Sequence, residues 1–110
     1  GPDQHLLYRL TGDYFAVHAD PDFARASGFS GPILHGACTL GYACRMLVDV
    51  LLAGEPSRLR RLACRFAGHV YPGTELELEI EARKSGWARW RVRAVADGRL
   101  LIDRGECEFV

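Results

Sequence analysis

The stretch GACTLGYACRMLVDVLL, residues 36–52, is the longest segment in which apolar residues recur at every third or fourth position. The recurring apolar residues are Leu40, Ala43, Cys44, Leu47, Val50 and Leu51. This spacing is typical of an α-helix with an apolar face, and Gly41 and Ala43 permit close packing. Few polar residues interrupt the segment. We therefore predict a helix over residues 36–52 that is buried on most sides.

The sequence after Pro56 alternates instead with the period of two that is typical of β-strands. The apolar sets predicted to face inward are Leu62, Cys64 and Phe66; Leu76, Leu78 and Ile80; and Trp90, Val92 and Ala94. Turns are predicted at Pro72-Gly73, at Ser85-Gly86 and, as a two-residue hairpin turn, at Asp97-Gly98. A last strand is predicted over residues 100–109. Four strands in an antiparallel meander, wrapped around the helix, make an α+β fold.

The outer faces of two predicted strands carry opposite charges. Glutamates occupy positions 75, 77, 79 and 81, and arginines occupy positions 89, 91 and 93. Because these strands are neighbours in sequence, we expect their charges to pair across the sheet and to fix its register. This structural role is favoured over an anion-binding site.

Shorter helices are predicted before the long one. Asp3 is expected to cap a helix over residues 4–10 that Gly12 stops, and residues 12–18 are expected to form a loop. Asp20-Pro21 has the pattern of an N-cap followed by proline at the first helical position. That second helix is expected to end at Gly28.

Composition limits the class of protein. The chain has 110 residues, of which 48% are hydrophobic and 25% charged, so we expect one globular domain over residues 1–110. Fourteen Lys and Arg residues balance fourteen Asp and Glu residues, which favours neither a nucleic-acid nor a membrane partner. The four cysteines show no C-x-x-C pair or other metal-ligand spacing, so we expect no metal site and free thiols in a reducing cytoplasm.

One polar constellation is suited to proton transfer. Asp13 and His18 are five residues apart on the predicted loop, where both can converge on one water molecule. Gly36 begins the long predicted helix, so its N–H can point at a developing oxyanion. The same spacing also allows Asp13 to cap a turn and His18 to be a packing residue.

Several segments resemble the MaoC-like hydratase family. They are residues 8–13 (YRLTGD), 18–24 (HADPDFA), 28–29 (GF), 31–36 (GPILHG), 65–66 (RF) and 70–73 (VYPG). The family comprises (R)-specific enoyl-CoA hydratases with a hot-dog fold, in which an antiparallel sheet wraps a long central helix. The resemblance implies reversible hydration of a trans-2-enoyl thioester to the (R)-3-hydroxyacyl thioester, in lipid or polyketide metabolism. It implies no metal or redox cofactor, because coenzyme A or acyl-carrier protein carries the substrate.

The resemblance also implies roles for individual residues. Asp13 and His18 match the pair that holds and activates water, with the division of roles between them left open, and Gly36 matches the residue whose N–H polarises the thioester carbonyl. Phe15, Cys44 and Arg65 are assigned to substrate binding. Cys44 falls where relatives often carry a serine near the acyl pocket. For Arg65, a phosphate or loop contact and a packing or salt-bridge role are both open.

Two departures from the family pattern lead to further expectations. The family loop usually reads Asp-x-Asn-Pro-x-His, whereas this chain has Phe15-Ala16 in place of Asn-Pro. An alternative is therefore a non-catalytic hot-dog unit that binds an acyl thioester or completes a heteromeric hydratase. The chain also begins at its first helix, where single-domain relatives place a strand, which would leave a sheet edge open. We thus expect a homodimer or hetero-oligomer that forms through sheet edges.

Overall fold

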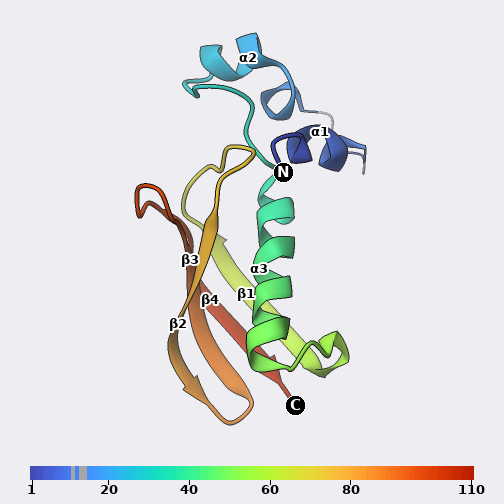
Figure 1. Cartoon of the computed structure of the whole chain (residues 1–110), viewed down its shortest axis with the longest axis vertical. Coiled ribbons are helices and arrows are strands. Elements are labelled where there is room, and N and C mark those ends of the chain that lie inside the picture. Colours follow the sequence, from blue (N-terminus) through green and yellow to red (C-terminus); the bar gives the residue numbers. More distant parts are fainter. Residues whose placement is uncertain (11, 13–14) are drawn as a thin grey trace. The chain divides into compact units, whose positions relative to one another are not determined.

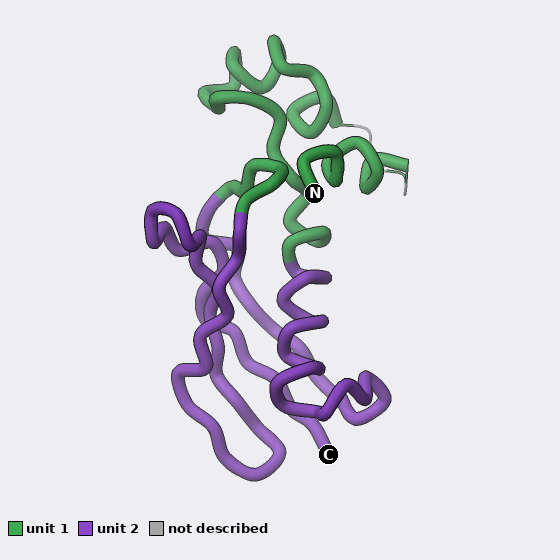
Figure 2. The backbone as a smooth tube through the Cα atoms, in the orientation of Figure 1, with its two compact units in different colours: residues 1–39, 69–74 green, residues 40–68, 75–110 purple. Residues whose placement is uncertain are grey.

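The computed structural model describes residues 1–10, 12 and 15–110, and its backbone divides into two compact units. Unit 1 comprises residues 1–39 and 69–74, and unit 2 comprises residues 40–68 and 75–110 (Figure 2). Within these described ranges, no helix combines the length and the hydropathy that a membrane span requires.

Unit 2 is built on a four-stranded antiparallel sheet (Figure 1). Its strands are β1 (Leu59–Phe66), β2 (Leu76–Lys84), β3 (Trp87–Ala94) and β4 (Leu100–Phe109), and the short 3-10 helix η2 (Pro56–Arg58) precedes β1. The spatial order is β1-β4-β3-β2, so β1 pairs with β4 and not with β2. The predicted meander is therefore wrong at its first connection. Residues 67–75 link β1 to β2, and this connection is too long for the tight turn that would pair two consecutive strands.

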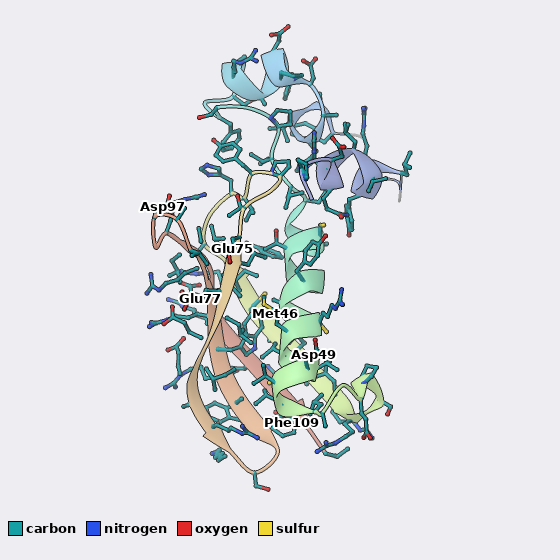
Figure 3. All side chains as sticks on the ribbon, in the orientation of Figure 1. Met46, Asp49, Glu75, Glu77, Asp97 and Phe109 are labelled. Carbon is teal, nitrogen blue, oxygen red and sulfur yellow. The ribbon has the colours of Figure 1, made fainter. Side chains whose placement is uncertain are left out.

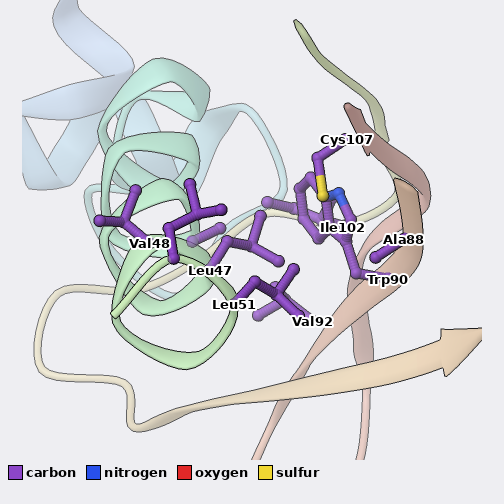
Figure 4. Close-up of a cluster of buried hydrophobic side chains, with 10 residues drawn as sticks. Leu47, Val48, Leu51, Ala88, Trp90, Val92, Ile102 and Cys107 are labelled. Atoms are coloured by element: carbon purple, nitrogen blue, oxygen red, sulfur yellow. The ribbon is translucent and has the colours of Figure 1, made fainter. Parts of the chain in front are cut away.

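The core of unit 2 lies between the sheet and helix α3 (Gly36–Leu51). Residues 36–39 of this helix belong to unit 1 and the remainder to unit 2. The buried core residues are Ala43, Leu47, Val48, Leu51, Leu52, Ala88, Trp90, Val92, Ile102 and Cys107 (Figure 4). Removal of this apolar surface from water is the main stabilising contribution to the unit. The predicted helix, strands and α+β class are confirmed.

One face of α3 is exposed in this chain. Gly41, Arg45 and Asp49 follow one another at four-residue spacing on that face, and Figure 3 shows Asp49 on α3. The prediction that the helix is buried on most sides is wrong for the single chain. The sheet covers only the face that carries residues such as Leu47 and Leu51, so the opposite face meets solvent.

The charges of β2 and β3 pair as predicted. Glu79 lies opposite Arg91 in the register, and its two carboxylate oxygens accept hydrogen bonds from Arg91 at 3.1 Å and from Arg93 at 2.7 Å. Glu77 lies on the same strand (Figure 3) and faces Arg93 in the register. The hydrogen bond from Arg91 is the main reason why the pKa of the Glu79 carboxyl lies below its usual value. Such half-exposed pairs fix register more than they stabilise.

Two local strand predictions fail. The loop between β3 and β4 takes residues 95–99 and is longer than the predicted two-residue turn, because only Gly98 adopts a positive φ there, of 70°. A two-residue type I′ turn would need positive φ at both central residues. Phe66, predicted to face inward with Leu62 and Cys64, is 52% exposed. It is the last residue of the edge strand β1 and lies outside the group of side chains that packs against the core.

Unit 1 consists mainly of short helical elements. They are α1 (Gln4–Arg9), the 3-10 helix η1 (Ala16–His18) and α2 (Pro21–Ala26). Asp20 caps α2 as predicted, since its Oδ1 accepts hydrogen bonds from the N–H groups of Asp22 and Phe23 at 3.0 and 3.4 Å. Asp3 occupies the N-cap position of α1, but its side chain makes no capping hydrogen bond. The predicted loop before α2 contains the single turn η1, which positions His18.

Candidate active site

Two hydrogen bonds tie the turn η1 to Ile33. The N–H of Ile33 donates to the carbonyl oxygen of Val17 at 3.1 Å, and Nδ1 of His18 lies 2.9 Å from the carbonyl oxygen of Ile33. A carbonyl oxygen can only accept, so Nδ1 is the donor and carries the proton of the neutral ring. The other ring nitrogen, Nε2, is then left with a lone pair. His18 is thus oriented as a proton acceptor through Nε2.

Aromatic rings surround the His18 imidazole. The ring of His35 stacks on it with a centroid separation of 3.9 Å and an angle of 22° between the planes. The ring of Phe15 meets it edge-on at 6.2 Å. His35 is only 3% exposed, and Tyr8 of α1 packs against its ring at 4.7 Å. These contacts restrict the His18 ring to one orientation in a half-buried position.

The N-terminus of α3 lies directly after His35. The carbonyl oxygen of His35 accepts the N–H groups of Cys38 and Thr39 at 3.0 and 3.3 Å, which begins the helix. The N–H of Gly36 follows this carbonyl in the same peptide unit and precedes the first N–H groups that bond within the helix, and Gly36 is exposed. An N–H at the positive end of a helix dipole stabilises negative charge on an oxygen. The backbone before the helix is fixed by the hydrogen bond from Leu34 N–H to Val70 O, at 2.7 Å.

The structure brings only some of the predicted site residues into one unit. His18, Phe15 and Gly36 all lie in unit 1. Asp13, the predicted partner of His18, lies outside the described residues. Phe15 is 58% exposed, and its ring also packs edge-on against Phe23 of α2 at 5.6 Å.

Cys44 and Arg65 lie in unit 2. Cys44 is half-buried on α3, where it packs against the core. The guanidinium of Arg65 on β1 forms a two-pronged ion pair with Asp103 on β4, in which Nε donates to Oδ1 at 2.8 Å. This hydrogen bond is the main reason why the pKa of Asp103 is lowered and that of Arg65 raised. Of the roles left open for Arg65, the salt bridge is the one formed in this chain.

Two contributors to the site were not identified from the sequence. Ile33 acts through its main-chain carbonyl, and no sequence signal marks a carbonyl that orients a histidine. His35 acts by stacking on His18, and this contact depends on two segments that meet only in the folded chain. Within the described ranges, no three His, Cys, Asp or Glu side chains gather as metal ligands would.

Comparison with known proteins assigns the chain to a family. The model of the MaoC-like domain matches residues 1–101. The chain belongs to the MaoC-like domain family. A Mycobacterium tuberculosis protein named as an enoyl-CoA hydratase is 48% identical to this MaoC-like chain over 101 residues, which is 92% of the chain and 30% of that protein. The chain spans less than two fifths of the length of the curated relatives that it matches.

Solved structures agree with the family assignment. A MaoC-like dehydratase from Phytophthora capsici superimposes with a TM-score of 0.94 and 33% identity, over 100% of this MaoC-like chain and 37% of that protein. An (R)-hydratase from A. caviae superimposes with a TM-score of 0.73 and 27% identity, over 97% of the chain and 84% of that protein. The hot-dog fold implied by the sequence resemblance is confirmed.

Proposed function

We propose that this MaoC-like chain catalyses the reversible hydration of a trans-2-enoyl thioester to the (R)-3-hydroxyacyl thioester. The observation that carries the proposal is the His18 imidazole, whose Nδ1 is held by Ile33, so that Nε2 carries the lone pair of the neutral ring. It lies beside His35, whose successor Gly36 presents an N–H at the start of α3. Relatives named as enoyl-CoA hydratases and a structural neighbour named as an (R)-hydratase support the reaction and its stereochemistry.

The proposed reaction adds water across the double bond conjugated to the thioester. The oxygen of water bonds to the β-carbon while one of its protons passes to the protein. The electron pair of the double bond moves toward the thioester oxygen, where the Gly36 N–H stabilises the negative charge. A proton then bonds to the α-carbon. Asp13 and His18 together remove the first proton and supply the second, so the protein ends in its starting protonation state.

The remaining expectations belong to the same proposal. Residues 1–110 act as one hot-dog unit, and coenzyme A or acyl-carrier protein carries the substrate without a metal or redox cofactor. We propose that the unit works as a homodimer or hetero-oligomer, as the exposed edge strands β1 and β2 would allow. A cytoplasmic location fits the four cysteines, all of which are free thiols. Phe15 and Cys44 would contact the acyl chain.

The hydration assay tests this function. Crotonyl-CoA and a longer enoyl-CoA are incubated with the purified chain, and loss of the ultraviolet absorbance of the conjugated enoyl thioester is followed. We expect turnover, an (R)-configured product and loss of activity in Asp13→Asn. Phe15-Ala16 favours one other candidate, the non-catalytic unit that binds thioester or completes a heteromeric enzyme. Calorimetric binding of the thioester without turnover would support that unit and contradict the hydratase.

A further inference from the structure

The loop that carries His18 is short. The turn η1 has three residues, held by hydrogen bonds from His18 N–H to Phe15 O at 3.1 Å and from Ala19 N–H to Ala16 O at 3.0 Å. Its main chain is also tied to its neighbours by hydrogen bonds from Asp20 N–H to Ala16 O at 2.7 Å and from Ile33 N–H to Val17 O at 3.1 Å. The Nδ1 bond to Ile33 selects one flip of the imidazole. Rotation about the bond that joins an imidazole to its Cβ is otherwise broad, because this torsion has no sharp staggered minima. Proton transfer requires a narrower orientation.

Ala16 stands where proline would stiffen this turn. It is the first residue of η1, and the first position of a helical turn is where proline is favoured because its φ is already fixed. Alanine does not fix that torsion covalently, so side-chain packing adds to the main-chain hydrogen bonds that keep His18 in one position.

The Phe15 ring makes two such contacts, one with His18 and one with Phe23. Its centroid lies 6.2 Å from that of His18, and the two rings meet edge-on. It also meets the ring of Phe23 in α2 edge-on, with 5.6 Å between the centroids and 83° between the Phe15 and Phe23 planes. Phe23 belongs to a capped helix, since its N–H donates to Asp20. The imidazole also stacks on the ring of His35, which is buried. Edge-to-face ring pairs attract one another beyond the effect of the area they bury.

We propose that Phe15 is a positioning residue for His18: its ring packs against the imidazole, which stacks on His35, and stiffens, through Phe23, a turn that lacks proline. This inference rests on the proposed function for its kinetic part only. Its structural part concerns the orientation of one side chain and stands whether or not the chain turns over substrate. A residue that only contacted the acyl chain would leave the His18 ring unaffected.

The test compares Phe15→Leu with Phe15→Tyr in the full chain. Leucine removes the ring, whereas tyrosine keeps it and is the conservative variant that should rescue the role. Phe66→Leu is the matched control, because Phe66 is 52% exposed and lies on β1 in the other unit, while Phe15 is 58% exposed. Circular dichroism and thermal unfolding establish that each variant is folded before it is compared.

The first readout is the NMR signal of the His18 ring protons, identified by its loss in His18→Gln. The nuclear Overhauser effects between these protons and those of the His35 ring report the stacking itself and do not depend on the ring current of Phe15. Phe15→Leu should weaken them, while Phe15→Tyr and Phe66→Leu leave them at their wild-type intensity. Unchanged effects in Phe15→Leu would overturn the proposal. Because this readout needs no substrate, it separates failure of the positioning role from failure of the hydratase.

The second readout is the division of the kinetic effect between kcat and KM on an enoyl thioester. A displaced imidazole slows the chemical step, and a misplacement of about 1 Å costs up to about 100-fold in rate. Phe15→Leu should lower kcat by about 10-fold or more, beyond any rise in KM from a lost acyl contact, and Phe15→Tyr should restore most of the loss in kcat. A raised KM with unchanged kcat would instead make Phe15 a substrate contact and overturn the positioning role.

Discussion

The indole of Trp90 lies over the α-carbon of Gly105, its register partner on the neighbouring strand β4. A Cβ added to Gly105 would overlap the ring carbons and the carbonyl oxygen of Trp90, which is itself fully buried. Gly105→Ala should therefore force the sheet or the indole to move and lower the free energy of unfolding by about 1–3 kcal/mol. Urea denaturation followed by Trp fluorescence measures this loss. A midpoint equal to that of the wild type would contradict the packing.

Gly41 gives the opposite expectation for the same type of substitution. It lies on the exposed face of α3, and an added Cβ would meet no described atom within 4 Å. Alanine costs less backbone entropy in a helix, so Gly41→Ala should raise the free energy of unfolding by about 0.5–1 kcal/mol. The same urea titration compares the two variants. Destabilisation would mean that another surface packs against this face in solution.

The ion pair between Arg65 and Asp103 should contribute to the acid sensitivity of the fold. Arg65 lowers the pKa of the Asp103 carboxyl in the folded chain. A lowered pKa stabilises the fold above the pKa of the unfolded state, and this contribution disappears as the pH falls through the folded value. The urea midpoint of the wild type should thus fall more steeply from about pH 6 to about pH 3 than that of Asp103→Asn. Parallel curves would show that the pair has no effect on stability.

Features that depend on residues close together in sequence could be predicted, and features that depend on contacts between distant residues could not. Asp20-Pro21 and Gly28 determine α2 through neighbouring residues, so its limits could be predicted. The pairing of β1 with β4 joins Arg65 to Asp103, which are far apart in sequence, and no local pattern specified it. Phe66 is exposed because it lies outside the group of side chains that packs against the core, and the sequence did not indicate where this group ends.

The candidate site shows the same difference between local features and contacts between distant residues. His18 and Gly36 could be proposed from the sequence, because the side-chain type of His18 and the position of Gly36 at the start of a helix carry the chemistry. The bond from His18 Nδ1 to the Ile33 carbonyl and the stacking of His18 on His35 join residues that only folding brings together. The sequence likewise did not indicate the contact between Phe15 and Phe23. Comparison with the family loop allowed Phe15 to be assigned only to substrate binding.

The measurement that tests the account most directly is the steady-state hydration of an enoyl thioester by His18→Gln beside the wild type. Glutamine has an amide N–H that can still donate to Ile33, but it cannot exchange a proton as the Nε2 of imidazole does. We expect kcat to fall about 100- to 10,000-fold, with KM and the thermal midpoint close to those of the wild type. A His18→Gln protein that keeps kcat within about 2-fold of the wild type would contradict the assignment of proton transfer to His18.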